Sequence, residues 1–176
     1  MYEPSGRAAA KSIRIDQVLL DILEKKAEEE NLGTNAFIEN ILLRYAKHYR
    51  YLEDYPVITL SQSMFHSIIN EIPEENIEKL GMAQGKKGPR GYLLMRGLTP
   101  TLDSVIKVLE ENYARGGNWF ELHRHETNGN KILHCTHRNG LRWSKFLASY
   151  LTAMFEEILD IEVRVDITES YITIRI

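Results

Sequence analysis

Residues 11–16 read Lys-Ser-Ile-Arg-Ile-Asp, and this stretch, together with the two helical patterns after it, decides the fold of the N-terminal region. Ile13 and Ile15 alternate with polar side chains, which is the pattern of a β-strand with one apolar face. Asp16 is of a residue type that caps helices, and apolar residues recur at helical spacing from residue 19 to residue 23. The sequence therefore predicts a short strand followed directly by a helix.

A second helix is predicted after Gly33, which we expect to end the first one. Thr34 or Asn35 can cap the second helix, and we expect it to run toward Asp54 and to end before Pro56. Its apolar residues at helical spacing are Phe37, Ile38, Ile41, Leu42 and Tyr45. One strand and two helices in about forty residues cannot enclose a core. We therefore expect this segment to be stable only when it is paired.

This arrangement resembles the ribbon-helix-helix family of Arc, MetJ and CopG type repressors. The resemblance covers residues 10–50 and is carried by Ser-Ile-Arg-Ile-Asp at residues 12–16 and Leu-Gly-Thr-Asn-Ala at residues 32–36. It implies a homodimer in which the strands of two chains form an antiparallel ribbon that enters the major groove of double-stranded DNA. It also implies that the ribbon contacts bases through Ala10, Ser12 and Arg14.

The three base-contacting positions differ in what they can recognise. Arg14 can donate two hydrogen bonds to guanine, and Ser12 can bond several base edges without strong preference. Ala10 departs from the polar residue that is usual in the family, so it offers only an apolar contact. Specificity is therefore expected to rest on Arg14 and Ser12, doubled by the symmetry of the dimer.

Phosphate contacts are expected beside the ribbon. Thr34 and Asn35 begin the second helix, and the backbone N–H groups at a helix N-terminus favour a phosphate. Residues 1–15 hold three basic residues and one acidic residue, a local net charge of +2, so Lys11 and Arg7 are further candidates. Residues 1–10 show no periodicity and are predicted to be a flexible arm, in which Arg7 is equally well explained as part of a disordered tail.

Composition limits the class of protein without naming it. The chain has 176 residues, of which 43% are hydrophobic and 27% charged, as in ordinary globular proteins of one or two domains. The net charge of -3 means that DNA contact must be confined to one region. The single cysteine, Cys135, favours a reducing compartment. We expect a cytoplasmic protein without membrane contact, because no apolar run has the length of a membrane span or the form of a signal peptide.

Residues 11–55 are thus predicted to be a DNA-binding domain, and residues 57–176 a second domain of α+β type. In its first part, Val57–Leu60 is a candidate strand, and Ser61 or Ser63 can cap a helix that continues to Ile72. A further helix is predicted from Pro73 to a break at Gly85. The glycine-rich, basic stretch at residues 85–91 is predicted to be a flexible connector. Phosphate binding is the alternative, although the spacing of a Walker motif is missing.

The remaining residues show clearer patterns. A helix is predicted from Thr101 to Gly116, and a hairpin turns at Asn128-Gly129. A long amphipathic helix follows Gly140. A last hairpin turns at Glu169-Ser170 and would pair Val163 with Ile176, Val165 with Ile174 and Ile167 with Ile172. These elements predict a ββαββ antiparallel sheet covered on one face by helices, a domain for ligand sensing or oligomerisation.

The first hairpin carries a cluster of histidines. With an even loop, His123, His125 and His134 share one face while Cys135 points to the other. An odd loop or a bulge would instead bring Cys135 and His137 beside the first two histidines. Three histidines on an exposed face could bind zinc, nickel or copper, and the alternative is that they are ordinary surface residues. The nickel-responsive regulators are similar in overall layout, but their order of ligands differs.

Taken together, the sequence predicts a sequence-specific transcriptional regulator, a repressor, that acts as a homodimer or higher homo-oligomer. Two alternatives stay open: an antitoxin whose C-terminal domain binds a partner protein, and a metal-responsive regulator. Catalysis is not expected, because the sequence contains no nucleophile elbow, paired-carboxylate arrangement or cofactor fingerprint.

Overall fold

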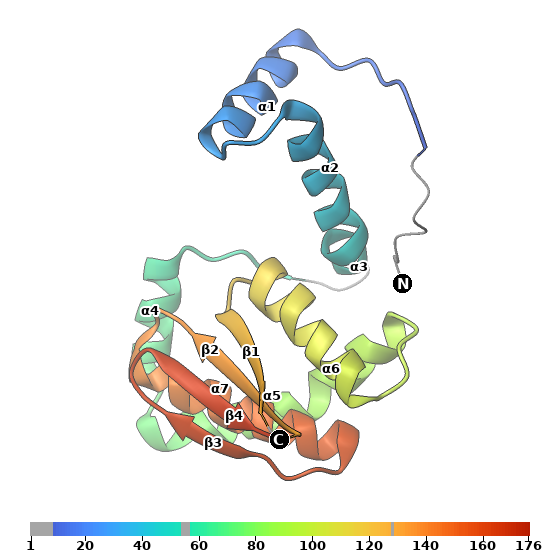
Figure 1. Cartoon of the computed structure of the whole chain (residues 1–176). Helices are drawn as coiled ribbons and strands as arrows, with labels where there is room; N and C mark the ends of the chain where they lie inside the picture. The colour runs from blue at the N-terminus through green and yellow to red at the C-terminus, as the bar shows by residue number, and fades with distance from the viewer. Residues whose placement is uncertain (1–8, 54–56, 128) are drawn as a thin grey trace. The chain divides into compact units, whose positions relative to one another are not determined.

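The computed structural model describes residues 9–53, 57–127 and 129–176. The chain divides into two compact units, residues 1–56 and residues 57–176 (Figure 1). Helices and a four-stranded antiparallel sheet make this an α+β protein, as predicted. No helix within the described ranges is both long and apolar enough to cross a membrane.

The N-terminal unit is helical. Its elements are α1 (Gln17–Glu29), α2 (Thr34–Arg44), the π-helical η1 (Tyr45–Tyr49) and α3 (Arg50–Leu52). Asp16 caps α1 as predicted, since its carboxylate accepts hydrogen bonds from the backbone N–H groups of Val18 at 3.0 Å and Leu19 at 3.3 Å.

The turn between α1 and α2 differs from the prediction. Asn31, with a φ of 55°, takes the left-handed conformation after α1 that was expected of Gly33. Asparagine adopts this conformation more readily than most residues. Gly33 is instead the N-cap of α2, in extended conformation, and Thr34 is the first helical residue. The prediction that Thr34 or Asn35 caps α2 is therefore wrong by one or two positions.

Residues 9–15, where the ribbon strand is predicted, form an extended stretch that pairs with no other described strand. A two-stranded ribbon draws its hydrogen bonds from a second chain, so a single chain cannot display it. The ribbon stays a prediction.

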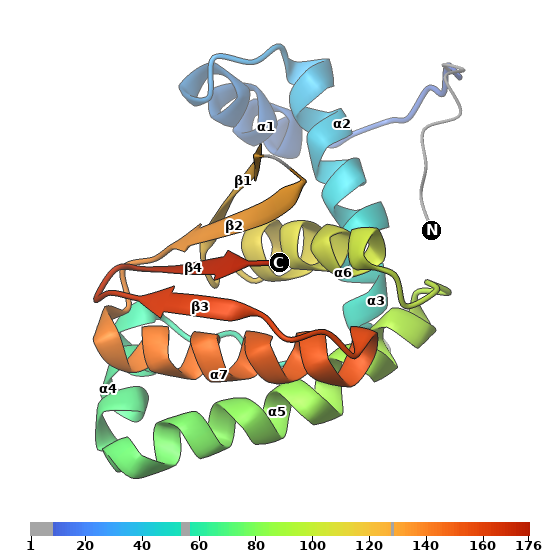
Figure 2. The same ribbon diagram turned by 60° about the horizontal axis from the view of Figure 1, so that its bottom comes forward.

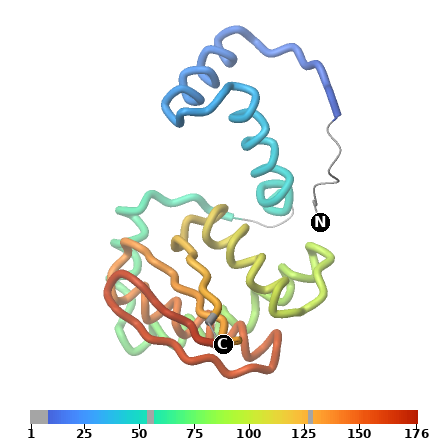
Figure 3. The backbone as a smooth tube through the Cα atoms, in the orientation of Figure 1, coloured from blue at the N-terminus to red at the C-terminus, as the bar shows by residue number. Residues whose placement is uncertain are grey.

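The C-terminal unit contains four helices, a π-helical segment and four strands within the described residues. Its elements are α4 (Gln62–Glu71), α5 (Glu74–Met95), α6 (Leu102–Val108), η2 (Leu109–Gly116), β1 (Glu121–Thr127), β2 (Asn130–Thr136), α7 (Gly140–Leu159), β3 (Arg164–Ile167) and β4 (Tyr171–Arg175). The strand order is β1-β2-β4-β3. Figure 2 shows α7 beneath the sheet and α5 beneath α7, and Figure 3 traces the same path through the backbone.

Both hairpins have the predicted registers. Leu122 lies opposite Cys135 and His123 opposite His134, which is the arrangement of the even loop. In the last hairpin the pairs are Val165 with Ile174 and Ile167 with Ile172. The predicted pair of Val163 and Ile176 lies just beyond the strand ends, because β3 begins at Arg164 and β4 ends at Arg175. Alternation then places the buried residues Leu133, Cys135, Ile172 and Ile174 on one face of the sheet.

The predicted break at Gly85 is wrong, because α5 continues to Met95 through the glycine-rich stretch and through Pro89. The cause is close packing on α7. A Cβ atom at Gly81 would lie 2.6 Å from the carbonyl oxygen of Phe146, and one at Gly85 would overlap the carbonyl of Tyr150. The glycines therefore allow two helix backbones to approach each other, and residues 85–91 are not a connector loop.

The predicted strand at Val57–Leu60 is also wrong, since these residues lie outside the sheet. Ser61, rather than Ser63, caps α4 by accepting a hydrogen bond from the N–H of Met64 at 3.3 Å. Thr101 is the N-cap of α6 and forms a reciprocal capping box with Ser104.

Candidate nucleic-acid interface

The residues predicted to read DNA bases lie on the extended stretch that precedes α1. Ala10, Ser12 and Arg14 are exposed, and so is Lys11. Ile13, between two of them, leaves 63% of its surface exposed although it is a large apolar residue. Arg7, predicted to contact phosphate, lies outside the described residues.

The predicted phosphate contacts lie at the start of α2. Thr34 and Asn35 are its first two residues, and the N-cap Gly33 makes no side-chain capping hydrogen bond. As at other helix N-termini, the N–H groups of this first turn have no partner within the helix itself. Asn35 is exposed and Thr34 half-buried.

The N-terminal unit exposes most of its apolar side chains. Among residues 9–53, only Ala27 and His48 are buried. Large apolar residues with more than a third of their surface exposed are Ile13, Val18, Leu19, Ile22, Leu32, Ile41, Leu42, Tyr45 and Tyr49. Large aliphatic and aromatic side chains are among those most often buried in folded proteins. Within residues 9–53, the apolar side chains therefore form almost no buried core.

The predicted metal-binding histidines share the face of the sheet opposite the buried one. His123 and His125 are exposed, while His134 is half-buried beside the ring of Tyr171, with the ring centroids 4.7 Å apart. The Nδ1 atom of His134 lies 2.9 Å from the hydroxyl of Thr173. In the described part of the chain, no three His, Cys, Asp or Glu side chains are placed so that they could hold an ion. The metal site stays a prediction.

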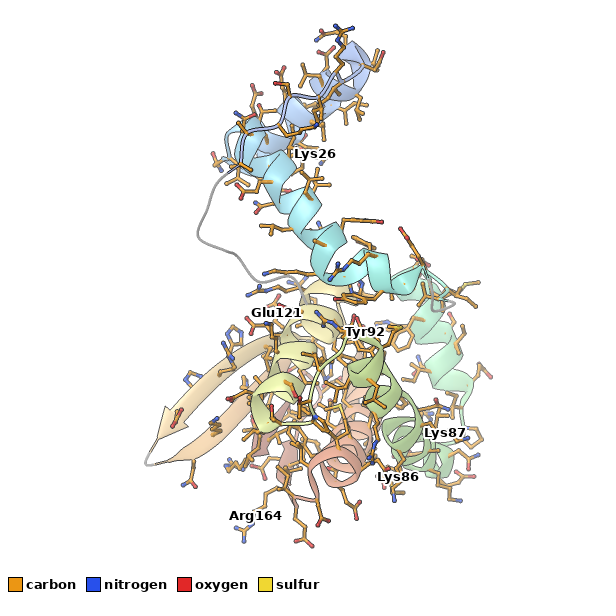
Figure 4. All side chains as sticks on the ribbon, turned by 90° about the vertical axis from the view of Figure 1, so that its right-hand side faces the viewer. Lys26, Lys86, Lys87, Tyr92, Glu121 and Arg164 are labelled. Atoms are coloured by element: carbon orange, nitrogen blue, oxygen red, sulfur yellow. The ribbon has the colours of Figure 1, made fainter. Side chains whose placement is uncertain are left out.

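The alternative register, with Cys135 and His137 beside the other histidines, is wrong. Cys135 is buried on the opposite face, and burial raises the pKa of its thiol to about 12. At that pKa the thiol stays protonated near neutral pH and is a poor nucleophile or ligand. Glu121, the first residue of β1, is labelled in Figure 4. It lies on the same face of the sheet as His123, His125 and His134.

His137 has a structural role in the loop between β2 and α7. Its Nδ1 atom accepts a hydrogen bond from the N–H of Asn139 at 3.3 Å, and its Nε2 atom lies 2.9 Å from the hydroxyl of Ser144. Ser144 in turn donates to the carbonyl of Thr168 at 2.5 Å. These bonds suit a neutral imidazole that carries its proton on Nε2. Burial lowers the pKa of His137, which agrees with this assignment.

A charged cavity between α6, η2 and β1 was missed by sequence reasoning. It has a volume of about 330 Å³, and Glu111 and Arg124 are among its lining residues. These two residues lie on different elements, and the sequence carries no motif that joins them. The predicted hairpin register places Arg124 on the side of β1 that faces the core. A charged residue in that position was the one indication in the sequence of a charged site there.

Comparisons of the chain with protein-family models, with curated proteins and with solved structures found no match.

Proposed function

We propose that this protein is a homodimeric transcriptional regulator, a repressor, that reads the major groove of DNA with a two-stranded ribbon. The single observation that carries the proposal is the exposed apolar face of the N-terminal unit. Nine large apolar side chains are exposed there, against two buried residues. Such a unit gains its stability by covering this face.

The extent of the face fits a second copy of the same chain. A stable interface of standard size takes about 800 Å² from each partner, and nine exposed large apolar side chains can supply much of that area. Ile13, on the extended stretch, belongs to this set along with residues of α1 and α2. A two-fold pair that covers the face therefore brings the two stretches at residues 9–15 side by side, where they can form the ribbon.

The polar side chains of the paired stretches then face the DNA. Arg14 donates to guanine, Ser12 adapts to several base edges, and Ala10 makes an apolar contact. Lys11 and the first turn of α2, at Thr34 and Asn35, contact phosphates and set the register of the protein on the duplex. The local positive charge of this arm explains how a chain with a net charge of -3 can bind DNA.

The test begins by selecting bound sequences from random double-stranded DNA with the purified full chain. The Arg14→Ala variant is then expected to bind the selected site more weakly by about 1 to 3 kcal/mol and to relax specificity at one base pair in each half-site. The reason is the loss of a two-bond contact to guanine. Affinities are measured by fluorescence anisotropy at fixed salt concentration.

Lys25→Ala provides the control, since Lys25 is an exposed cation on α1 outside the predicted interface. This variant is expected to bind as the wild type does. If Arg14→Ala bound the selected site with unchanged affinity and specificity, the proposed readout would be wrong.

A further inference from the structure

The strongest unassigned feature of the C-terminal unit is the charged cavity between α6, η2 and β1. Its volume of about 330 Å³ lies within the range of small-molecule sites. Six of its lining side chains are charged, and Ile106 is the one apolar residue that lines it. A site of this composition selects for a charged, polar ligand.

The inner wall of the cavity contains a carboxylate that is almost fully buried. Glu111 is 8% exposed, and its Oε2 atom accepts a hydrogen bond from the guanidinium of Arg96 at 2.7 Å. The side chain of Arg96 is itself completely buried. A buried ion pair of this kind adds little net stability compared with apolar residues. Its position beside a cavity therefore points to a role in binding.

Arg115 and Arg124 both line the cavity, and each forms an ion pair with Glu110. One carboxylate oxygen of Glu110 accepts from Arg115 at 2.7 Å, and the other lies 3.4 Å from Arg124. A guanidinium carries five N–H donors, which is more than one such contact uses. Arg115 and Arg124 therefore retain N–H donors that can bind a carboxylate.

The backbone of η2 contributes to this arrangement. Residues Leu109–Gly116 form a π-helical segment, which places Glu110, Glu111 and Arg115 along one wall of the cavity. π-helical turns are rare and occur frequently at functional sites. This observation is independent of the charges and supports the same conclusion.

The charges of the lining indicate the class of ligand. Among the lining residues, Lys107, Arg115 and Arg124 are matched in number by Asp103, Glu110 and Glu111. From outside the lining, Arg96 pairs with Glu111 and Lys131 with Asp103, so the cavity presents both signs of charge. A molecule that carries both charges a few ångströms apart can satisfy both sets. We propose that this cavity binds a small zwitterion, an α-amino acid, with its carboxylate on Arg124 and Arg115 and its ammonium group toward Glu111 and Asp103. Because Ile106 alone supplies apolar surface, the amino acid has a short side chain.

The experiment measures the melting temperature of the full chain with each of the proteinogenic L-amino acids at millimolar concentration. At least one amino acid with a short side chain is expected to raise Tm by about 3 °C or more, because it binds only the folded state. Its deaminated acid and its decarboxylated amine, tested in parallel, are expected to have no such effect.

Arg124→Gln is the matched variant, since its side chain is 55% exposed and its replacement leaves the buried pair intact. This variant is expected to keep the Tm of the unliganded protein and to lose the rise. Arg164→Gln, at an exposed arginine of β3 labelled in Figure 4, is expected to keep the rise. The proposal is overturned if no amino acid raises Tm, if a singly charged analogue raises it equally, or if Arg124→Gln retains the rise. The readout requires no DNA, so its failure is separate from failure of the proposed DNA binding.

Discussion

At the scale of single residues, His137 makes the folded state sensitive to pH. Burial lowers its pKa in the folded protein, whereas in the unfolded chain it titrates near its ordinary value of 6.5. Just below pH 6.5, His137 is therefore protonated in the unfolded chain but still largely neutral in the folded protein. This histidine contributes stability above pH 6.5 that is lost as the pH falls toward its folded pKa, by at most about 1.4 kcal/mol per pH unit.

The measurement compares urea unfolding at pH 7.5 and at lower pH for the wild type and His137→Gln. The variant is expected to be less stable at pH 7.5 and to lose less of its stability on acidification. His125→Gln, at an exposed histidine, is expected to follow the wild-type curve. An identical pH dependence of the wild type and His137→Gln would refute the role given to this histidine.

At the scale of elements, the contact of α5 with α7 depends on glycines whose positions are not equivalent. A Cβ atom at Gly81 would lie 2.6 Å from a carbonyl oxygen of α7, whereas one at Gly88 would meet nothing within 4 Å. Gly81→Ala is therefore expected to destabilise the protein by about 1 to 3 kcal/mol through overpacking. Gly88→Ala is expected to stabilise it by about 0.5 to 1 kcal/mol, because alanine favours the helix. Urea unfolding tests both, and a stabilising Gly81→Ala would contradict the close approach.

The elements also show how far local patterns predict structure. The cap at Asp16 and the registers of both hairpins follow from neighbouring residues, and the structure confirms them. The break predicted at Gly85 fails because the helix is maintained by contacts with α7, far away in the chain. Val57–Leu60 has the composition of a strand, but these residues join no sheet.

At the scale of the whole molecule, the proposed dimer makes the N-terminal unit dependent on protein concentration. Leu42 is 60% exposed on the apolar face, so Leu42→Glu would place a charge in the interface. We expect the dissociation constant of the dimer to rise roughly 30-fold to 700-fold, which corresponds to about 2 to 4 kcal/mol. Sedimentation equilibrium measures this dissociation constant. Leu94→Glu, on α5 at 63% exposure, is the matched control and should leave the dimer intact. A Leu42→Glu protein that dimerised as the wild type does would exclude this face as the interface.

The sequence by itself determined the α+β class, the cap at Asp16 and the registers of the two hairpins, because these depend on local patterns of residues. It also predicted His123, His125 and His134 on one face for an even loop, and the hairpin has that register. Only the tertiary structure decided that α5 is continuous and that Arg96 and Glu111 meet beside a charged cavity. The physical reason is that both depend on surfaces brought together from distant parts of the chain.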